Sequence, residues 1–224
     1  MPAVINAARK FILGAYHDLP NVLFISSLVL GALIGYLPLV WVSLGLVANA
    51  GLIALFQNFL AFLFPTWAQV VVPAHNLMCT VFGRARPPTP VNRDETTIIA
   101  PSQWLGAAAF FATFVSYNSI MLLTRPAATG AAAEKIANRR AFSITTLVIS
   151  LVFFLFVLAR GFTGCESWLG GVSGVAVGGG FAVLFWYLLD ACGAGSVPDV
   201  LQITSAMAPD AAAGSDDPTP VVCA

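Results

Sequence analysis

Residues 167–189 read SWLGGVSGVAVGGGFAVLFWYLL and contain no Lys, Arg, Asp or Glu. A helix needs about 20 predominantly apolar residues to cross the hydrocarbon core of a bilayer, and this stretch is long enough. A charged side chain at the centre of a bilayer costs roughly 2.5–3.5 kcal/mol on insertion scales. Charge-free stretches of this length therefore indicate segments that lie in lipid. Three more such stretches cover residues 19–83, 96–124 and 141–159.

The composition of the whole chain indicates the same class of protein. Of the 224 residues, 58% are hydrophobic and 9% are charged, and the mean hydropathy is +0.87. Charged residues make up about 25% of a typical soluble domain. Ten Lys and Arg balance ten Asp and Glu, so the chain carries no net charge. These values exclude a soluble enzyme, a disordered chain and a nucleic-acid-binding protein that uses a basic face.

We predict an all-α fold, a polytopic transmembrane helix bundle of about five spans within residues 19–190. Residues 1–18 are expected to form an amphipathic helix in the membrane interface, with Arg9 and Lys10 facing the lipid headgroups. Residues 191–224 are expected to form a polar, partly disordered tail. The expected spans are 19–37, 39–64, 101–123, 144–159 and 169–189.

The number of spans stays between four and six because residues 66–82 allow several interpretations. This segment contains Pro73 and His75 and could form a re-entrant hairpin, a surface helix or a kinked additional span. Residues 83–97 are expected to form a polar loop. The distribution of basic residues does not choose an orientation, since five or six spans both place six on one side and four on the other.

The last span carries small residues at every fourth position. Such a stripe lets a second helix backbone approach closely in lipid. It favours packing within the chain, and the alternatives are self-association into an oligomer or a pore-lining helix. A similar stripe in the first span is expected to pack against it. The candidate helix-packing residues are Ser27, Gly31, Gly35, Gly170, Gly174, Gly178 and Ala182.

Polar and thiol side chains are the remaining candidate sites. Asn49, Gln57, Asn58 and Asn118 fall within expected spans, where an amide most often joins two helices and less often lines a path for a polar ligand or ion. No expected span has a carboxylate, Lys or Arg near its middle, which argues against a proton-coupled transporter. The cysteines are expected to be free thiols without metal-ligand spacing, and they are Cys79, Cys165, Cys192 and Cys223.

No catalytic or nucleotide-binding motif occurs in the sequence, and His17 and His75 are its two histidines. We therefore expect a protein that is not an enzyme and that uses no cofactor and no metal.

Several short motifs occur together in this chain. They are Pro101-Ser102-Gln103-Trp104, Tyr117-Asn118, Asn138-Arg139-Arg140, Thr163-Gly164-Cys165-Glu166, Cys192-Gly193-Ala194 and Val222-Cys223. These motifs resemble those of small multi-pass membrane proteins encoded by large nucleocytoplasmic DNA viruses of algae and protists. The resemblance covers residues 40–223 and brings over no functional residue. It implies a virus-encoded protein of the membrane that lies under the capsid.

These observations together predict a structural integral membrane protein of a virion inner membrane or of a host membrane modified by a virus. Its expected partners are the lipid bilayer and other membrane or capsid proteins, including further copies of itself, and not nucleic acid. The alternative is an oligomeric channel or small transporter formed around the Gly-rich last helix. Ionic conductance after reconstitution separates the two functions.

Overall fold

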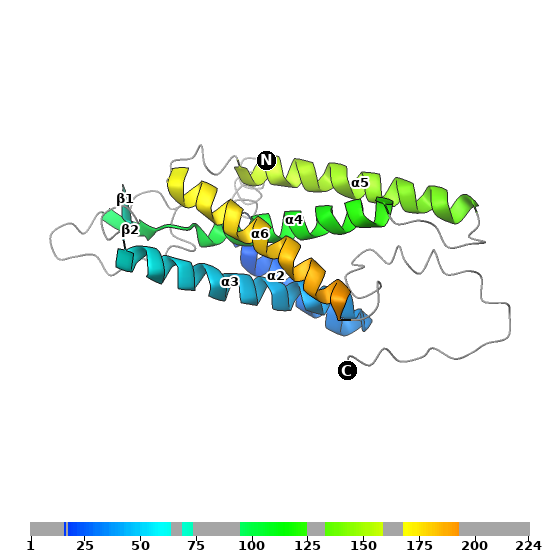
Figure 1. The fold of residues 1–224 in the computed structure, drawn as a ribbon, viewed down its shortest axis with the longest axis horizontal. Coiled ribbons are helices and arrows are strands. Elements are labelled where there is room, and N and C mark those ends of the chain that lie inside the picture. The colour runs from blue at the N-terminus through cyan, green and yellow to red at the C-terminus, as the bar shows by residue number, and fades with distance from the viewer. Residues whose placement is uncertain are drawn as a thin grey trace, which may run out of the picture.

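The computed structural model describes residues 16, 18–63, 69–73, 95–124, 133–158 and 168–192. These residues form five helices (Figure 1), as expected for the predicted bundle. Four of the helices, α3 to α6, are long and apolar enough to cross a membrane. The chain is therefore a multi-pass membrane helix bundle. The helices are α2 (Leu19–Ile34), α3 (Leu37–Leu63), α4 (Gln103–Thr124), α5 (Ala133–Leu158) and α6 (Trp168–Ala191).

Helix α2 is shorter than its four neighbours. Its 16 residues extend for about 24 Å at 1.5 Å per residue, less than the roughly 30 Å of a hydrocarbon core. Gly35 ends the helix with a left-handed backbone conformation (φ 69°), and the N–H of Tyr36 donates a hydrogen bond to the carbonyl of Gly31 at 2.8 Å. This arrangement is a common glycine C-cap, and it turns the chain directly into α3.

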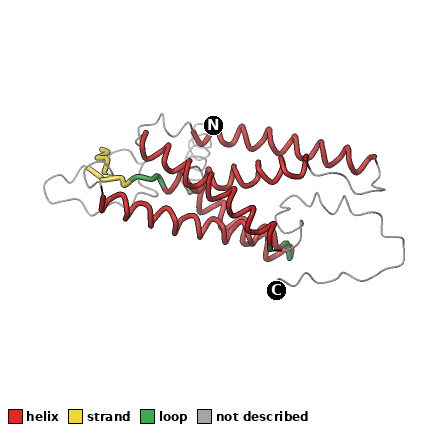
Figure 2. The backbone as a smooth tube through the Cα atoms, viewed as in Figure 1, coloured by secondary structure: helices red, strands yellow, loops and turns green. Residues whose placement is uncertain are grey.

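Two short strands lie between α3 and α4, at one end of the bundle (Figure 2). β1 (Gln69–Pro73) and β2 (Glu95–Ile99) pair antiparallel, with Gln69 opposite Ile99. The extended chain at β1 excludes a continuous helix over residues 66–82, and with it a kinked span there. The expected loop over residues 83–97 is corrected at its end, because residues 95–97 belong to β2. The β-branched run of Val70 to Val72 suits a strand.

Helix α4 is the centre of the bundle because it contacts the other four helices. In Figure 1, α5 lies along one side of α4, and α2 and α3 lie along the other. Helices α4 and α6 run in parallel, since the start of one contacts the start of the other: the N–H of Ser102 donates to the carbonyl of Gly170 at 2.8 Å. Near their ends, Trp186 Nε1 donates to Asn118 Oδ1 at 3.2 Å.

The main apolar core lies between α3, α4 and α6. Phe110 is fully buried, and its ring stacks on Phe114 with a centroid distance of 6.0 Å. Phe181 and Phe185 of α6 pack on the same ring, with centroid distances of 5.8 and 6.0 Å. A second cluster joins α4 to α5 through Trp104 and Val157.

The ends of the chain lie largely outside the described residues. The predicted interfacial helix covers residues 1–18, and Tyr16 is among the described residues there. The centroid of the Tyr16 ring lies 5.2 Å from that of Trp104 and 4.9 Å from that of Phe156. The predicted tail over residues 191–224 lies outside the described part of the chain after Cys192.

Candidate functional site

The interface between α4 and α6 brings two helix backbones into direct contact. A Cβ atom placed on Gly178 would overlap the carbonyl oxygen of Gly106 and lie 2.9 Å from its Cα. A Cβ atom on Gly174 would lie 2.6 Å from the carbonyl oxygen of Ser102. Real Cβ atoms do not approach other atoms this closely, so these positions on α6 accommodate no side chain larger than hydrogen.

The other two members of the α6 stripe also face α4. The carbonyl of Gly170 accepts the hydrogen bond from Ser102, and Ala182 is fully buried in the cluster around Phe110 and Phe114. The stripe is therefore buried inside the chain, as packing within the chain requires.

Two glycines that the sequence analysis did not select complete this interface. A Cβ atom on Gly106 would overlap Ile53 Cδ1 of α3, and one on Gly45 would lie 2.5 Å from Phe110 Cζ and 2.7 Å from Phe185 Cε1. Each is a single glycine in a long apolar run, so no repeated spacing marks it. Three helices, α3, α4 and α6, consequently meet at small residues.

The stripe in α2 does not pack against the last span, which corrects the sequence-based expectation. A Cβ atom on Gly31 would lie 2.9 Å from Val40 Cγ2 and 3.1 Å from Leu39 Cβ, so Gly31 faces α3. Ser27 is buried, and its hydroxyl donates to the carbonyl of Leu23 at 2.6 Å. Gly35 makes no helix contact of this kind, because a Cβ atom there would meet nothing within 4 Å. Its role is to end α2.

The four intramembrane amides lie in four different environments. Gln57 Nε2 donates to the carbonyl of Pro101 at 2.7 Å and so joins α3 to the residues that precede α4. Asn118 accepts the hydrogen bond from Trp186 described above. Asn49 is fully buried, and neither atom of its amide has a hydrogen-bond partner among the described residues. Asn58 is exposed on the surface of α3.

An additional polar contact joins α4 to α6 close to the Asn118–Trp186 hydrogen bond. The hydroxyl of Tyr117 donates to the hydroxyl of Tyr187 at 2.6 Å, and the ring of Tyr117 meets that of Trp186 edge to face at 5.2 Å. No spacing in the sequence predicts this pairing, because the two tyrosines are 70 residues apart.

The thiols show no site in the described part of the chain. Cys192 is an exposed cysteine just after α6. Cys79, Cys165 and Cys223 lie outside the described residues, as do His17 and His75. A search of the described residues finds no group of three His, Cys, Asp or Glu side chains that could hold a metal ion.

The described residues form two grooves between helices that are lined by neither a charged side chain nor a histidine. One, of about 430 Å³, lies between α4 and α5 and has the hydroxyl-bearing residues Thr113, Ser116 and Ser150 along it. The other, of about 180 Å³, lies between α2, α3 and α4. These lining residues can pack and form hydrogen bonds, but they include no carboxylate, lysine or histidine for acid–base chemistry.

The close contact at Gly178 predicts that alanine substitutions at two glycines of α6 change the stability in opposite directions. Gly178→Ala is expected to lower the free energy of unfolding by about 1–3 kcal/mol, because the added methyl forces α6 away from α4. Gly180→Ala is the matched control, since a Cβ atom at Gly180 meets nothing within 4 Å, and it is expected to raise stability by up to about 1 kcal/mol through helix propensity. Denaturant unfolding in mixed micelles measures both. Equal effects of the two substitutions would contradict the close contact.

The environments of Asn49 and Gln57 make a second prediction. Asn49→Leu removes an amide without a partner and is expected to stabilise the protein by about 1–3 kcal/mol. Gln57→Leu removes the hydrogen bond to Pro101 and is expected to destabilise it by roughly 1 kcal/mol. The same unfolding assay compares them. A loss of stability in Asn49→Leu that matches that of Gln57→Leu would mean that the Asn49 amide is hydrogen bonded.

Comparisons with protein-family models, with curated proteins and with solved structures find no match to this chain. The resemblance to virus-encoded membrane proteins stays an expectation from short motifs.

Proposed function

We propose that this chain is a structural component of a membrane, a helix bundle that packs in lipid and against other membrane proteins. The observation that carries the proposal is the closed interior of α3, α4 and α6. Backbone contact at Gly106, Gly174 and Gly178 brings these helices close together, and a cluster of buried aromatic and aliphatic side chains packs between them. A rigid interior of this kind suits a part that holds its shape and position.

The distribution of charge supports the same proposal. Among the described residues of α3, α4 and α6, Asp190 at the end of α6 is the one Asp, Glu, Lys, Arg or His. Transporters and pumps place ionisable groups inside the membrane, where they bind ions or relay protons. The interior of this bundle offers amides and hydroxyls, and the amides of Gln57 and Asn118 form hydrogen bonds between separate elements of the bundle.

The surface of α5 provides an apolar face that can contact lipid or neighbouring membrane proteins. Helix α5 packs on α4 and exposes large apolar side chains along its other side, among them Val148, Val152 and Leu155. Lipid tails or apolar helices of neighbouring proteins can cover these side chains equally well. The motif resemblance favours a virion inner membrane or a virus-modified host membrane as the location, with capsid or membrane proteins as the neighbours.

The alternative function, an oligomeric channel formed around α6, needs the glycine face of α6 to be free for other copies. In the described structure that face packs on α4 of the same chain. A pore built on it would have to give up the tightest contact of the bundle, which favours the structural role.

Reconstitution tests the choice between these functions. The purified chain in a planar bilayer is expected to pass no current above that of a protein-free bilayer, because α3, α4 and α6 pack against one another through glycines and apolar side chains. The matched variant is Gly180→Ala, which alters the lipid-exposed side of α6 and is expected to be equally silent. Discrete current steps that Gly178→Ala changes and Gly180→Ala does not would contradict the structural role and establish the channel.

A further inference from the structure

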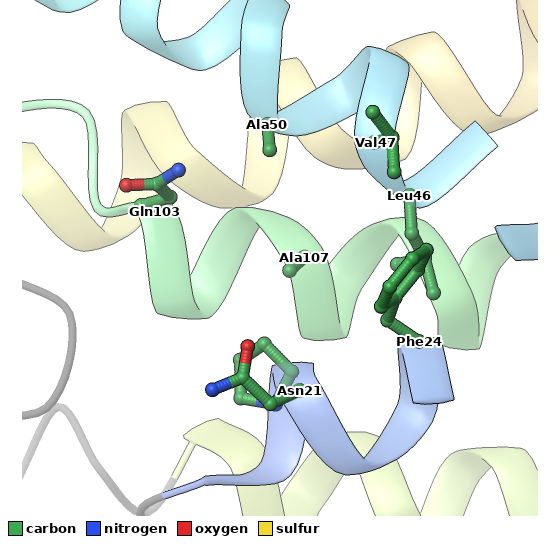
Figure 3. A pocket seen from close by; sticks show the side chains of 8 residues that line it. Asn21, Phe24, Leu46, Val47, Ala50, Gln103 and Ala107 are labelled. Carbon is green, nitrogen blue, oxygen red and sulfur yellow. The ribbon is translucent and has the colours of Figure 1, made fainter. Parts of the chain in front are cut away.

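The groove between α2, α3 and α4 arises because α2 is short. Asn21, in the first turn of α2, lies across the groove from Ala50, which is near the middle of α3. Helix α2 therefore packs along the first half of α3 and does not reach the second half. The groove of about 180 Å³ opens where α2 begins, with Ala107 of α4 along one wall (Figure 3).

The groove is polar at one end and apolar at the other. Figure 3 shows Asn21 and Gln103 on the side nearest the start of α4, and Phe24, Leu46 and Val47 at the opposite end. Two residues with side-chain amides thus line one end of a groove that is otherwise apolar. No charged side chain lines this groove.

The polar end of the groove lies beside the starts of two helices. Gln103 is the first residue of α4, and Ser102 before it is bonded to Gly170 near the start of α6. The exposed Asp18 immediately precedes α2, three residues before Asn21. A charged side chain is most stable in contact with water or lipid headgroups, so Asp18 favours polar surroundings at this end of the groove.

We propose that this groove binds a single glycerolipid of the bilayer, with part of one acyl chain against Phe24, Leu46 and Val47 and the ester group beside Gln103 and Asn21. An ester offers oxygen acceptors and no donor, and the NH₂ groups of Asn and Gln are donors. The volume takes about six groups of the size of a water molecule, which is enough for the first methylenes of a chain. The site goes beyond the structural role above and does not depend on it.

Retention of a photoactivatable lipid tests this site. The full chain is reconstituted with a phosphatidylcholine that carries a diazirine near the carboxyl end of one acyl chain, extracted in mild detergent, washed and illuminated. Labelling is expected to concentrate on the peptides around Asn21, Ala50 and Gln103. Ala50→Phe, which fills the groove, is expected to reduce this labelling at least five-fold. Ala48→Phe, on the exposed side of the same helix turn, is the matched control and is expected to leave it unchanged.

The polar end has its own test. A diether analogue of the same lipid lacks the ester carbonyls and is expected to label the groove several-fold less than the diester. Gln103→Leu is expected to remove most of this preference while the apolar end still retains lipid. Ala107→Leu provides a second filling variant if Ala50→Phe does not fold. Labelling that is spread evenly over the lipid-facing helices, or that neither filling variant lowers, would overturn the proposal.

Discussion

Direct contact between the backbones of α4 and α6 is the constraint on which the rest of the bundle depends. Lipid tails are as apolar as leucine, so moving an apolar side chain from lipid into a helix interface gains little free energy. Close van der Waals contact has to supply the attraction instead, and Gly178 against Gly106 brings the two backbones into direct contact. The ring stack around Phe110 and the contacts of α3 follow from the position that this pair fixes.

The residues just before α4 show how the bundle handles backbone that is not helical. Unpaired N–H and C=O groups are costly at membrane depth unless protein covers and satisfies them. Ala100 and Pro101 are buried, the carbonyl of Pro101 accepts from Gln57, and the N–H of Ser102 donates to Gly170. The hydroxyl of Ser102 then accepts from the N–H of Leu105 and caps α4. Gln57 thus has a structural role, because it satisfies a backbone carbonyl just before the start of α4.

The sequence predicted the helices better than their partners, for a physical reason. The exclusion of charge from lipid is a property of each segment alone, so residues 101–123 and 169–189 could be assigned to spans without knowing their neighbours. A glycine stripe says which face of α6 is close to something, but not that this is Gly106. Gly31 and Gly35 share the spacing of the α6 stripe, yet one packs on α3 and the other caps α2. Lone glycines such as Gly45 carry no pattern at all.

A stripe with a repeat of four residues does not by itself fix how α6 is placed along α4. Sliding α6 by one turn, about 5.4 Å, could bring Gly174 opposite Gly106 and would still allow close approach. The opposite slide would bring Ala182 there, where no Cβ atom fits. The hydrogen bonds from Trp186 to Asn118 and from Tyr117 to Tyr187 hold only in the observed register. Glycine therefore sets how near the two helices lie, and the polar aromatic pairs set their register, as buried polar groups do in other helix pairs.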